Sequence, residues 1–232
     1  MSKFTILHLY PTTLRLNGEV GNVVALAERG KAGGLDVTVL SAELGESLPS
    51  SRPDLIFIGS GILSAVRVAS LDLEKNAPKL IAWVKAGAKV LAVGGGFDLI
   101  SKGLEVEPGH TLFGLGLTDT KHRVTRDHLV GEVVTETGLA GFINWNREIV
   151  RAGEAAAFAT VSASDESRLV GYRDGYRSGN IIATNIQGPF LPMNPQVADG
   201  LLGLSGQVPE RIAMLNTLAE RAREAISRRV NR

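Results

Sequence analysis

The sequence predicts an α/β fold in which a doubly wound, mostly parallel sheet is flanked by helices and carries a partly antiparallel extension. Two observations lead to this fold class. Short runs of Val, Ile and Leu alternate with amphipathic segments through the first 105 residues, as βαβ units require. The chain has 232 residues and is 44% hydrophobic, which suffices for one large core, because single domains extend to roughly 250 residues. We therefore expect one domain over residues 1–232.

The first half of the chain contains four apolar runs that predict strands buried on both faces. These runs are Phe4–Leu9, Val37–Leu40, Leu55–Ile58 and Lys89–Val93. Apolar residues at helical spacing predict two helices between them, over Val20–Gly30 and Ala77–Ala86. Pro78 near the start of the second helix and Gly87 after its end are typical of helix boundaries.

The second half changes character from about His110 to Ile182, where Gly, Asn and Asp turns separate shorter strands. We interpret this part as the extension of the sheet. Its strands are expected at Leu129–Thr135, Gly141–Asn144 and Arg168–Tyr172, followed by an apolar strand at Ile181–Asn185. Two helices end the chain: Pro195–Leu204, with Asn194 as its N-cap, and the amphipathic segment Glu210–Arg229.

Charge and composition exclude several classes of function. The 25 Lys and Arg residues balance 24 Asp and Glu residues, so no global charge draws the chain to nucleic acid or to an anionic membrane. No apolar run approaches the roughly 20 residues that span a bilayer, and the N-terminus leads into a strand without a signal peptide. We therefore expect a cytoplasmic protein. The last helix is rich in arginine, which indicates a solvated face or a partner contact. Its charged residues include Arg211, Arg221, Arg223, Arg228, Arg229 and Arg232 against Glu210, Glu220 and Glu224.

The most informative segment is KVLAVGGGFDLIS, residues 89–101, in which a buried strand leads through three glycines into a helix. Such an elbow lifts its tip residue out of the sheet beside the positive end of the helix, where α/β hydrolases carry their nucleophile. The tip is Gly94, which has no nucleophilic atom, and the chain contains no Cys. A tight βα turn and an anion cradle are the alternatives, although the spacing matches neither G-x-G-x-x-G nor a P-loop.

Four segments together resemble the class I glutamine amidotransferases of the cobyric acid synthase-like branch. They are the elbow AVGGGFDLIS, the segment Ile182–Leu202, the strand and loop Pro53–Gly61, and Tyr10–Leu26 near the start. Within that branch the chain is similar to the amidotransferase subunits of lipid II isoglutaminyl synthases (GatD type). The resemblance implies the flavodoxin-like fold of this class, glutamine hydrolysis, and delivery of ammonia to a Mur ligase-like (MurT-type) partner in peptidoglycan synthesis. It implies no cofactor and no metal.

The resemblance also assigns site residues. It places the catalytic thiol at Gly94, the catalytic histidine at Gln187 and a usual glutamine at Asp98, so no catalytic residue is intact. Glycine supplies no nucleophile, and a glutamine side chain does not titrate near neutral pH. A substrate-binding and oxyanion set is kept, with Arg123 as an equal candidate for its arginine. This set consists of Gly59, Ser60, Gly61, Gly95 and Arg126.

Three hypotheses for the function follow. The first is a degenerate subunit that has lost glutaminase activity and serves a Mur ligase-like partner as scaffold or regulator. The second is a hydrolase with a relocated nucleophile at Ser60 or Ser64, which needs a base such as a histidine beside it. The third is a small-molecule binder that uses the old pocket for glutamine or a similar ligand. A metal site from His122, Asp127 and His128 matches no established spacing.

Overall fold

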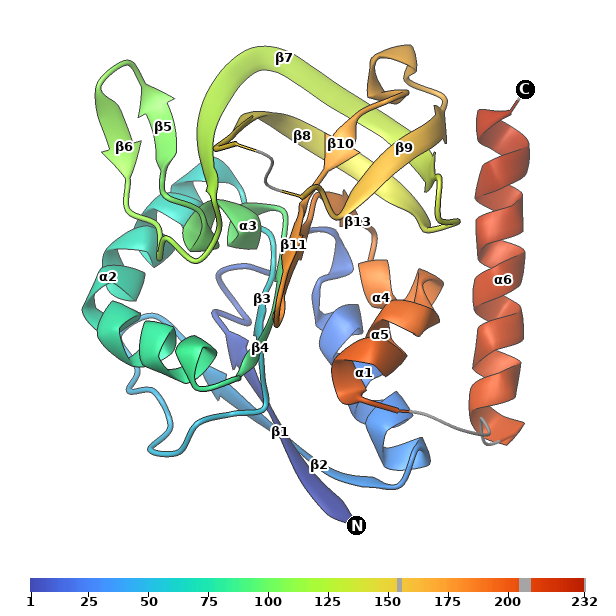
Figure 1. Cartoon of the computed structure of the whole chain (residues 1–232), viewed down its shortest axis with the longest axis horizontal. Coiled ribbons are helices and arrows are strands. Elements are labelled where there is room, and N and C mark those ends of the chain that lie inside the picture. Colours follow the sequence, from blue (N-terminus) through green and yellow to red (C-terminus); the bar gives the residue numbers. More distant parts are fainter. Residues whose placement is uncertain (154–155, 205–209, 232) are drawn as a thin grey trace.

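A mostly parallel sheet forms the centre of the molecule (Figure 1). The computed structural model describes residues 1–153, 156–204 and 210–231. Within these residues six strands pair in the order β11-β12-β4-β3-β1-β2, and every pairing is parallel except that of β11 with β12. The bounds are β1 (Ser2–Leu9), β2 (Leu35–Ala42), β3 (Leu55–Ile58), β4 (Lys89–Val93), β11 (Tyr176–Ser178) and β12 (Ile181–Thr184).

The predicted antiparallel extension is present as a second sheet, whose strands pair with one another. Within the described residues its pairings are antiparallel except for β5 with β7. The bounds are β5 (Leu104–Glu107), β6 (His110–Leu112), β7 (Thr120–Thr135), β8 (Ala140–Arg151), β9 (Ala159–Ser164), β10 (Arg173–Asp174) and β13 (Ile186–Gln187). After β12 the chain passes from the first sheet to the second at Asn185, and the strand that follows, β13, carries Gln187.

Helices cover both faces of the first sheet. In Figure 1, α2 and α3 lie on one side of the strands, whereas α1, α4 and α5 lie on the other and α6 stands at the outer edge. The bounds are α1 (Val20–Ala32), α2 (Leu63–Lys85), α3 (Gly95–Ile100), α4 (Phe190–Met193), α5 (Pro195–Leu202) and α6 (Glu210–Val230), with 3₁₀ turns at Leu16–Gly18 and Ser167–Leu169. No helix in the described part of the chain is long and apolar enough to cross a membrane.

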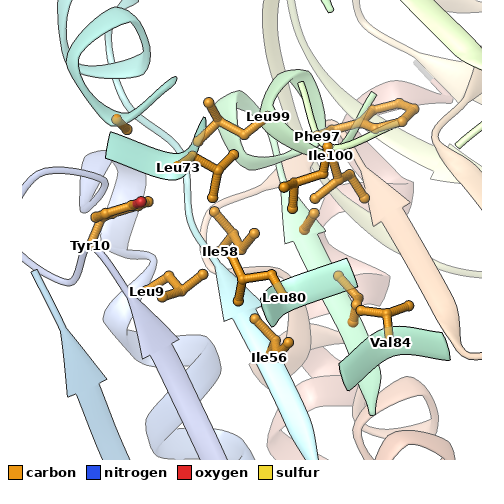
Figure 2. Close-up of a cluster of buried hydrophobic side chains, with 14 of the residues drawn as sticks. Leu9, Tyr10, Ile56, Ile58, Leu73, Leu80, Val84, Phe97, Leu99 and Ile100 are labelled. Atoms are coloured by element: carbon orange, nitrogen blue, oxygen red, sulfur yellow. The ribbon is translucent and has the colours of Figure 1, made fainter. Parts of the chain in front are cut away.

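Burial on both faces explains why the central strands are continuous apolar runs. Ile56 and Ile58 of β3 point toward α2, where they pack with Leu80 (Figure 2). Leu55 and Phe57 of the same strand belong to the other core cluster, together with residues of α1 and α5. Alternate side chains of one strand thus pack into two different core clusters. The four strands predicted in the first half are confirmed.

Two predicted elements need correction. The helix expected at Ala77–Ala86 begins at Leu63, and Pro78 lies inside it. Proline removes one hydrogen bond from a helix, but the buried stripe of α2 continues on both sides of it, and this packing outweighs the loss. The strand expected at Arg168–Tyr172 is instead a 3₁₀ turn at Ser167–Leu169, and the strand lies earlier, at β9.

The two predicted C-terminal helices are confirmed as α5 and α6. Asn194 does occupy the N-cap position of α5, but its side chain bonds the backbone of Ala140 and so ties the helix to β8. Two arginines of α6 dock that helix: Arg229 pairs with Glu132 of β7, and Arg223 donates to the carbonyl of Met193. Arg232 lies outside the described residues.

Candidate functional site

The elbow at Gly94 has the geometry that its sequence predicts. Gly94 follows β4, a strand in the middle of the first sheet, and immediately precedes α3. Its φ of 52° and ψ of −114° are strained for any residue with a side chain, which is why glycine is tolerated easily here. Its N–H donates to the carbonyl of Thr184 at 2.9 Å, which fixes the tip beside β12.

The structure brings Gln187 to the elbow tip, as the resemblance predicts. A Cβ atom built on Gly94 would lie 3.2 Å from Nε2 of Gln187, although the two positions are far apart along the chain. The same Cβ atom would overlap the hydroxyl of Ser60 and lie 2.8 Å from the Ser60 Cβ atom. The position of a nucleophile is therefore bounded by an amide on one side and a serine on the other.

The predicted oxyanion residues gather around the same point. The backbone N–H of Gly95 donates to Ser60 Oγ at 3.2 Å, so a serine hydroxyl occupies the donor that an oxyanion would use. A Cβ atom on Gly59 would overlap the carbonyl oxygen of Leu14. One on Gly61 would lie 2.7 Å from Cδ2 of Leu14 and 3.1 Å from Cβ of Ala65. These close approaches explain why the turn after β3 needs glycine on both sides of Ser60.

Gln187 is held by hydrogen bonds within the protein. Its Oε1 atom accepts from Nδ2 of Asn17 at 2.5 Å, and its Nε2 atom donates to the carbonyl of Asn185 at 3.4 Å. The side chain is buried, and Asn17 adopts a φ of 58° in the loop that approaches it. An amide that is bonded at both ends neither accepts nor returns a proton, so this position supplies no general base.

Glu19 is a buried carboxyl group beside this site that sequence reasoning missed. Burial raises its pKa to about 8, and the bond from Asn22 Nδ2 to Oε2, at 2.9 Å, lowers it only in part. The carboxyl group is therefore mostly protonated at neutral pH. Its Oε1 atom has no hydrogen-bond partner among the described residues. No local pattern marks Glu19 as buried, because its neighbour Gly59 comes from the turn after β3, which is distant in the sequence.

A second polar cluster lies one helical turn beyond the elbow. The fully buried Asp98 bonds Nδ1 of His122 at 2.7 Å, and its other oxygen lies 3.5 Å from Nε of Arg147. The ring of His122 packs edge-on against Phe97, and its Nε2 atom contacts Thr120 Oγ1 at 3.2 Å. This cluster joins α3 to β7 and β8. Asp98, which stands where the family usually has glutamine, therefore has a structural role. Arg147 is a member of the cluster that sequence reasoning missed.

Comparison with known proteins agrees with this geometry. The CobB/CobQ-like glutamine amidotransferase domain family matches residues 5–195, which is most of the chain. The chain belongs to that family.

Two relatives are named "Lipid II isoglutaminyl synthase (glutamine-hydrolyzing) subunit GatD". The one from Staphylococcus aureus is 27% identical over 208 residues, 87% of this chain and 84% of the relative. The one from Streptococcus pneumoniae is 22% identical over 202 residues, 84% of this chain and 78% of the relative. A crystal structure of a glutamine amidotransferase superposes with a TM-score of 0.55 at 12% identity, covering 85% of this chain and 98% of that one, which supports the fold.

The arginine that this amidotransferase chain would use to hold a substrate carboxylate stays a prediction. Arg126 is exposed in the bulge of β7 between Val124 and Leu129. Arg123 is also exposed and pairs with Glu105 at 2.8 Å. Across residues 1–153, 156–204 and 210–231, no hydrogen bond or ion pair ties either arginine to the elbow.

The other candidate nucleophiles of this family member lack a base. The hydroxyl of Ser60 contacts Gly95, Ser64 is exposed, and Ser101 donates to the carbonyl of Asp98 at 2.7 Å. Among the described residues, no hydrogen bond joins a serine to a histidine. The imidazole of His8 is buried, which lowers its pKa to about 4, and that of His128 bonds Asn144.

The metal alternative considered from the sequence does not assemble. His122 is buried with Asp98, whereas Asp127 and His128 are exposed on β7. In the described part of the chain, no three His, Asp or Glu side chains gather as a metal site.

Proposed function

We propose that this chain is a degenerate, glutaminase-inactive subunit of the amidotransferase family, one domain that acts as scaffold or regulator of a Mur ligase-like partner. The observation that carries the proposal is the pairing of Gly94 with Gln187 at the elbow tip. Glutamine hydrolysis by this route needs a thiolate that attacks the amide carbon and a base that moves its proton. Glycine offers no attacking atom, and the Gln187 amide is committed to Asn17.

The proposed partner is a cytoplasmic Mur ligase-like (MurT-type) subunit. Two relatives that cover most of the chain are named as subunits of a lipid II isoglutaminyl synthase, which supports a chain that works in a complex. The retained elbow supports a preserved fold around a silent centre. The ligase would then take free ammonia, and this chain would contribute stability or regulation. The proposal requires neither cofactor nor metal.

The test is to purify the chain with its ligase partner and to measure glutamate released from glutamine. We expect no glutamate above the rate without enzyme, while ligation driven by ammonium salts proceeds and depends on the presence of this chain. A matched control is the complex with Gln187→Ala. Because Gln187 supplies no general base, we expect this substitution not to lower glutamate release below that of the natural complex. Glutamine turnover at the rate of an ordinary amidotransferase would end the proposal.

The relocated-nucleophile hypothesis predicts a different result in the same preparation. A fluorophosphonate reagent would label a serine activated by a neighbouring base. We expect no labelling of Ser60 or Ser64, since neither is bonded to a histidine among the residues that the structure describes. The binder hypothesis predicts a rise in melting temperature with millimolar glutamine, because a ligand of the folded state stabilises it by mass action.

A further inference from the structure

Ser60 occupies two places that a glutamine substrate would need. Its hydroxyl accepts the backbone N–H of Gly95 at 3.2 Å, which is the donor expected to stabilise an oxyanion. Its Cβ atom lies 2.8 Å from the point where a side chain on residue 94 would begin. A thiol at the tip and a substrate carbonyl beside it would therefore both collide with one serine.

The backbone around Ser60 holds the side chain in this place. The N–H of Leu16 donates to the carbonyl of Ser60 at 2.9 Å, so the N-terminal loop lies across the turn after β3. That loop also carries Asn17, whose amide bonds Gln187. The loop is itself anchored, because the Glu43 carboxylate accepts hydrogen bonds from Thr13, with a side-chain oxygen distance of 2.5 Å. Ser60 is 4% exposed as a result, which leaves it little room to turn away.

We infer that Ser60 is an internal plug that closes the old glutamine site, so that the site rejects carboxamide and carboxylate ligands even when a thiol and an imidazole are restored. This inference rests on the proposed function. It adds a third loss to those at Gly94 and Gln187, one of access instead of chemistry. It also explains why Ser60, although its hydroxyl lies at the elbow, does not serve as a nucleophile: the hydroxyl is bonded to the N–H that would have to stabilise the product of its own attack.

The experiment compares three residues at position 60 in a chain whose dyad is restored by Gly94→Cys and Gln187→His. Serine keeps both obstacles, Ser60→Ala removes the hydroxyl, and Ser60→Gly also removes the Cβ atom. The probe is a chloromethyl ketone derived from glutamine, from which the introduced thiolate at position 94 displaces chloride to form a thioether. Its labelling rate is measured by mass spectrometry and divided by the rate with iodoacetamide, which corrects for thiol reactivity. Ser64→Ala in the same background is the control, because Ser64 is exposed.

We expect the corrected labelling rate of the Ser60→Gly variant to be at least tenfold that of the chain that keeps Ser60. The Ser60→Ala variant should lie between them, and Ser64→Ala should leave the rate unchanged. Equal rates with Ser60 kept and with Ser60→Gly would overturn the plug. Glutamate release by the natural chain would instead overturn the proposed function, so the two failures are distinguishable.

A second measurement needs no restored dyad and decides the question if the triple variant does not fold. In ¹⁵N-labelled Ser60→Gly protein with Gly94 intact, we expect millimolar glutamine or acetate to shift the Gly95 amide resonance. In the natural chain this resonance should stay in place. A Gly95 resonance that moves equally in both proteins, or in neither, contradicts the plug.

Discussion

Two polar clusters flank the elbow, and they differ in what they can do. The elbow site at Gly94, Ser60 and Gln187 has the strand–turn–helix geometry in which this class of fold carries a nucleophile, but none of these residues has a side chain that titrates near neutral pH. The cluster at Asp98 and His122, one helical turn away, contains ionisable groups, but it is fully buried. The elbow geometry and the ionisable side chains thus lie side by side in this molecule without coinciding.

The ionisable residues next to the elbow make structural contacts. Asp98 lies on α3, His122 on β7 and Arg147 on β8, so their contacts hold the elbow helix against the second sheet. A buried ion pair adds little net stability, but removal of one partner leaves the other uncompensated. These contacts therefore fix the position of the elbow, whether or not the elbow carries out any chemistry.

The largest effect is expected from Asp98→Ala, which breaks the buried cluster. The substitution leaves His122 Nδ1 without its partner and the guanidinium of Arg147, 6% exposed, without a counter-ion. Loss of one member of a buried pair costs about 3–5 kcal/mol. The free energy of unfolding, measured in urea, should fall by that amount.

The control is Asp119→Ala, which breaks an exposed pair with Lys102 in which the two atoms are 2.9 Å apart. Exposed pairs contribute about 0–1 kcal/mol, so this variant should unfold almost as the natural chain does. If the two variants lost the same free energy, the cluster at Asp98 would have no special role in holding the elbow.

The pH dependence of stability tests Glu19, the buried carboxyl group next to the Gly94 site. Burial raises the pKa of Glu19 to about 8 from its ordinary 4.5, so the folded chain holds a proton that the unfolded chain releases. The contribution of Glu19 to the free energy of unfolding is fully present below pH 4.5, and it is lost as the pH rises toward 8. Glu19→Gln keeps the bond from Asn22 and cannot ionise, so it should remove this loss.

The measurement is the free energy of unfolding between pH 6.5 and 8.5. His8 does not confuse this range, because its lowered pKa, about 4, confines its contribution to the fall in stability as the pH drops below 6.5. The natural chain should lose roughly 2 kcal/mol across the interval relative to Glu19→Gln. Parallel pH curves for the two proteins would show that Glu19 ionises normally in the folded state.

The predictable parts of the fold are those in which a local run of apolar residues indicates burial. Leu55–Ile58 and Lys89–Val93 are apolar at every position or nearly so, because both faces of a central strand are covered, and both strands are confirmed. The glycine run after the second of these strands predicted the elbow, because a strand that turns abruptly into a helix needs a residue without a side chain. The proximity of Gln187 to Gly94 followed from the family resemblance and from no local pattern.

The parts that were missed depend on contacts between distant segments. The first residues of β7, from Thr120 to Val124, are mostly polar and show no apolar alternation that predicts a strand, yet their backbone pairs with β8. The pairing of Asp98 with His122 spans 24 positions and joins helix α3 to β7 of the second sheet. Pro78 favoured a helix start, whereas packing of α2 against the sheet placed it mid-helix. Composition and periodicity do not show which residues far apart in the sequence come into contact.

The smallest of the expected effects isolates the steric contact between Gly94 and Ser60 at the elbow. Gly94→Ala places a Cβ atom against Ser60 at a φ of 52°, whereas Gly87→Ala meets a φ of 97° with no atom within 4 Å. Both variants are strained by the positive φ, but only the first also overlaps a neighbour. We expect Gly94→Ala to lose roughly 1–2 kcal/mol more than Gly87→Ala in urea unfolding. Adding Ser60→Gly should recover most of this excess, since it removes the overlapping atoms. If Gly94→Ala lost no more than Gly87→Ala, or if Ser60→Gly recovered nothing, Ser60 would not fill the nucleophile position.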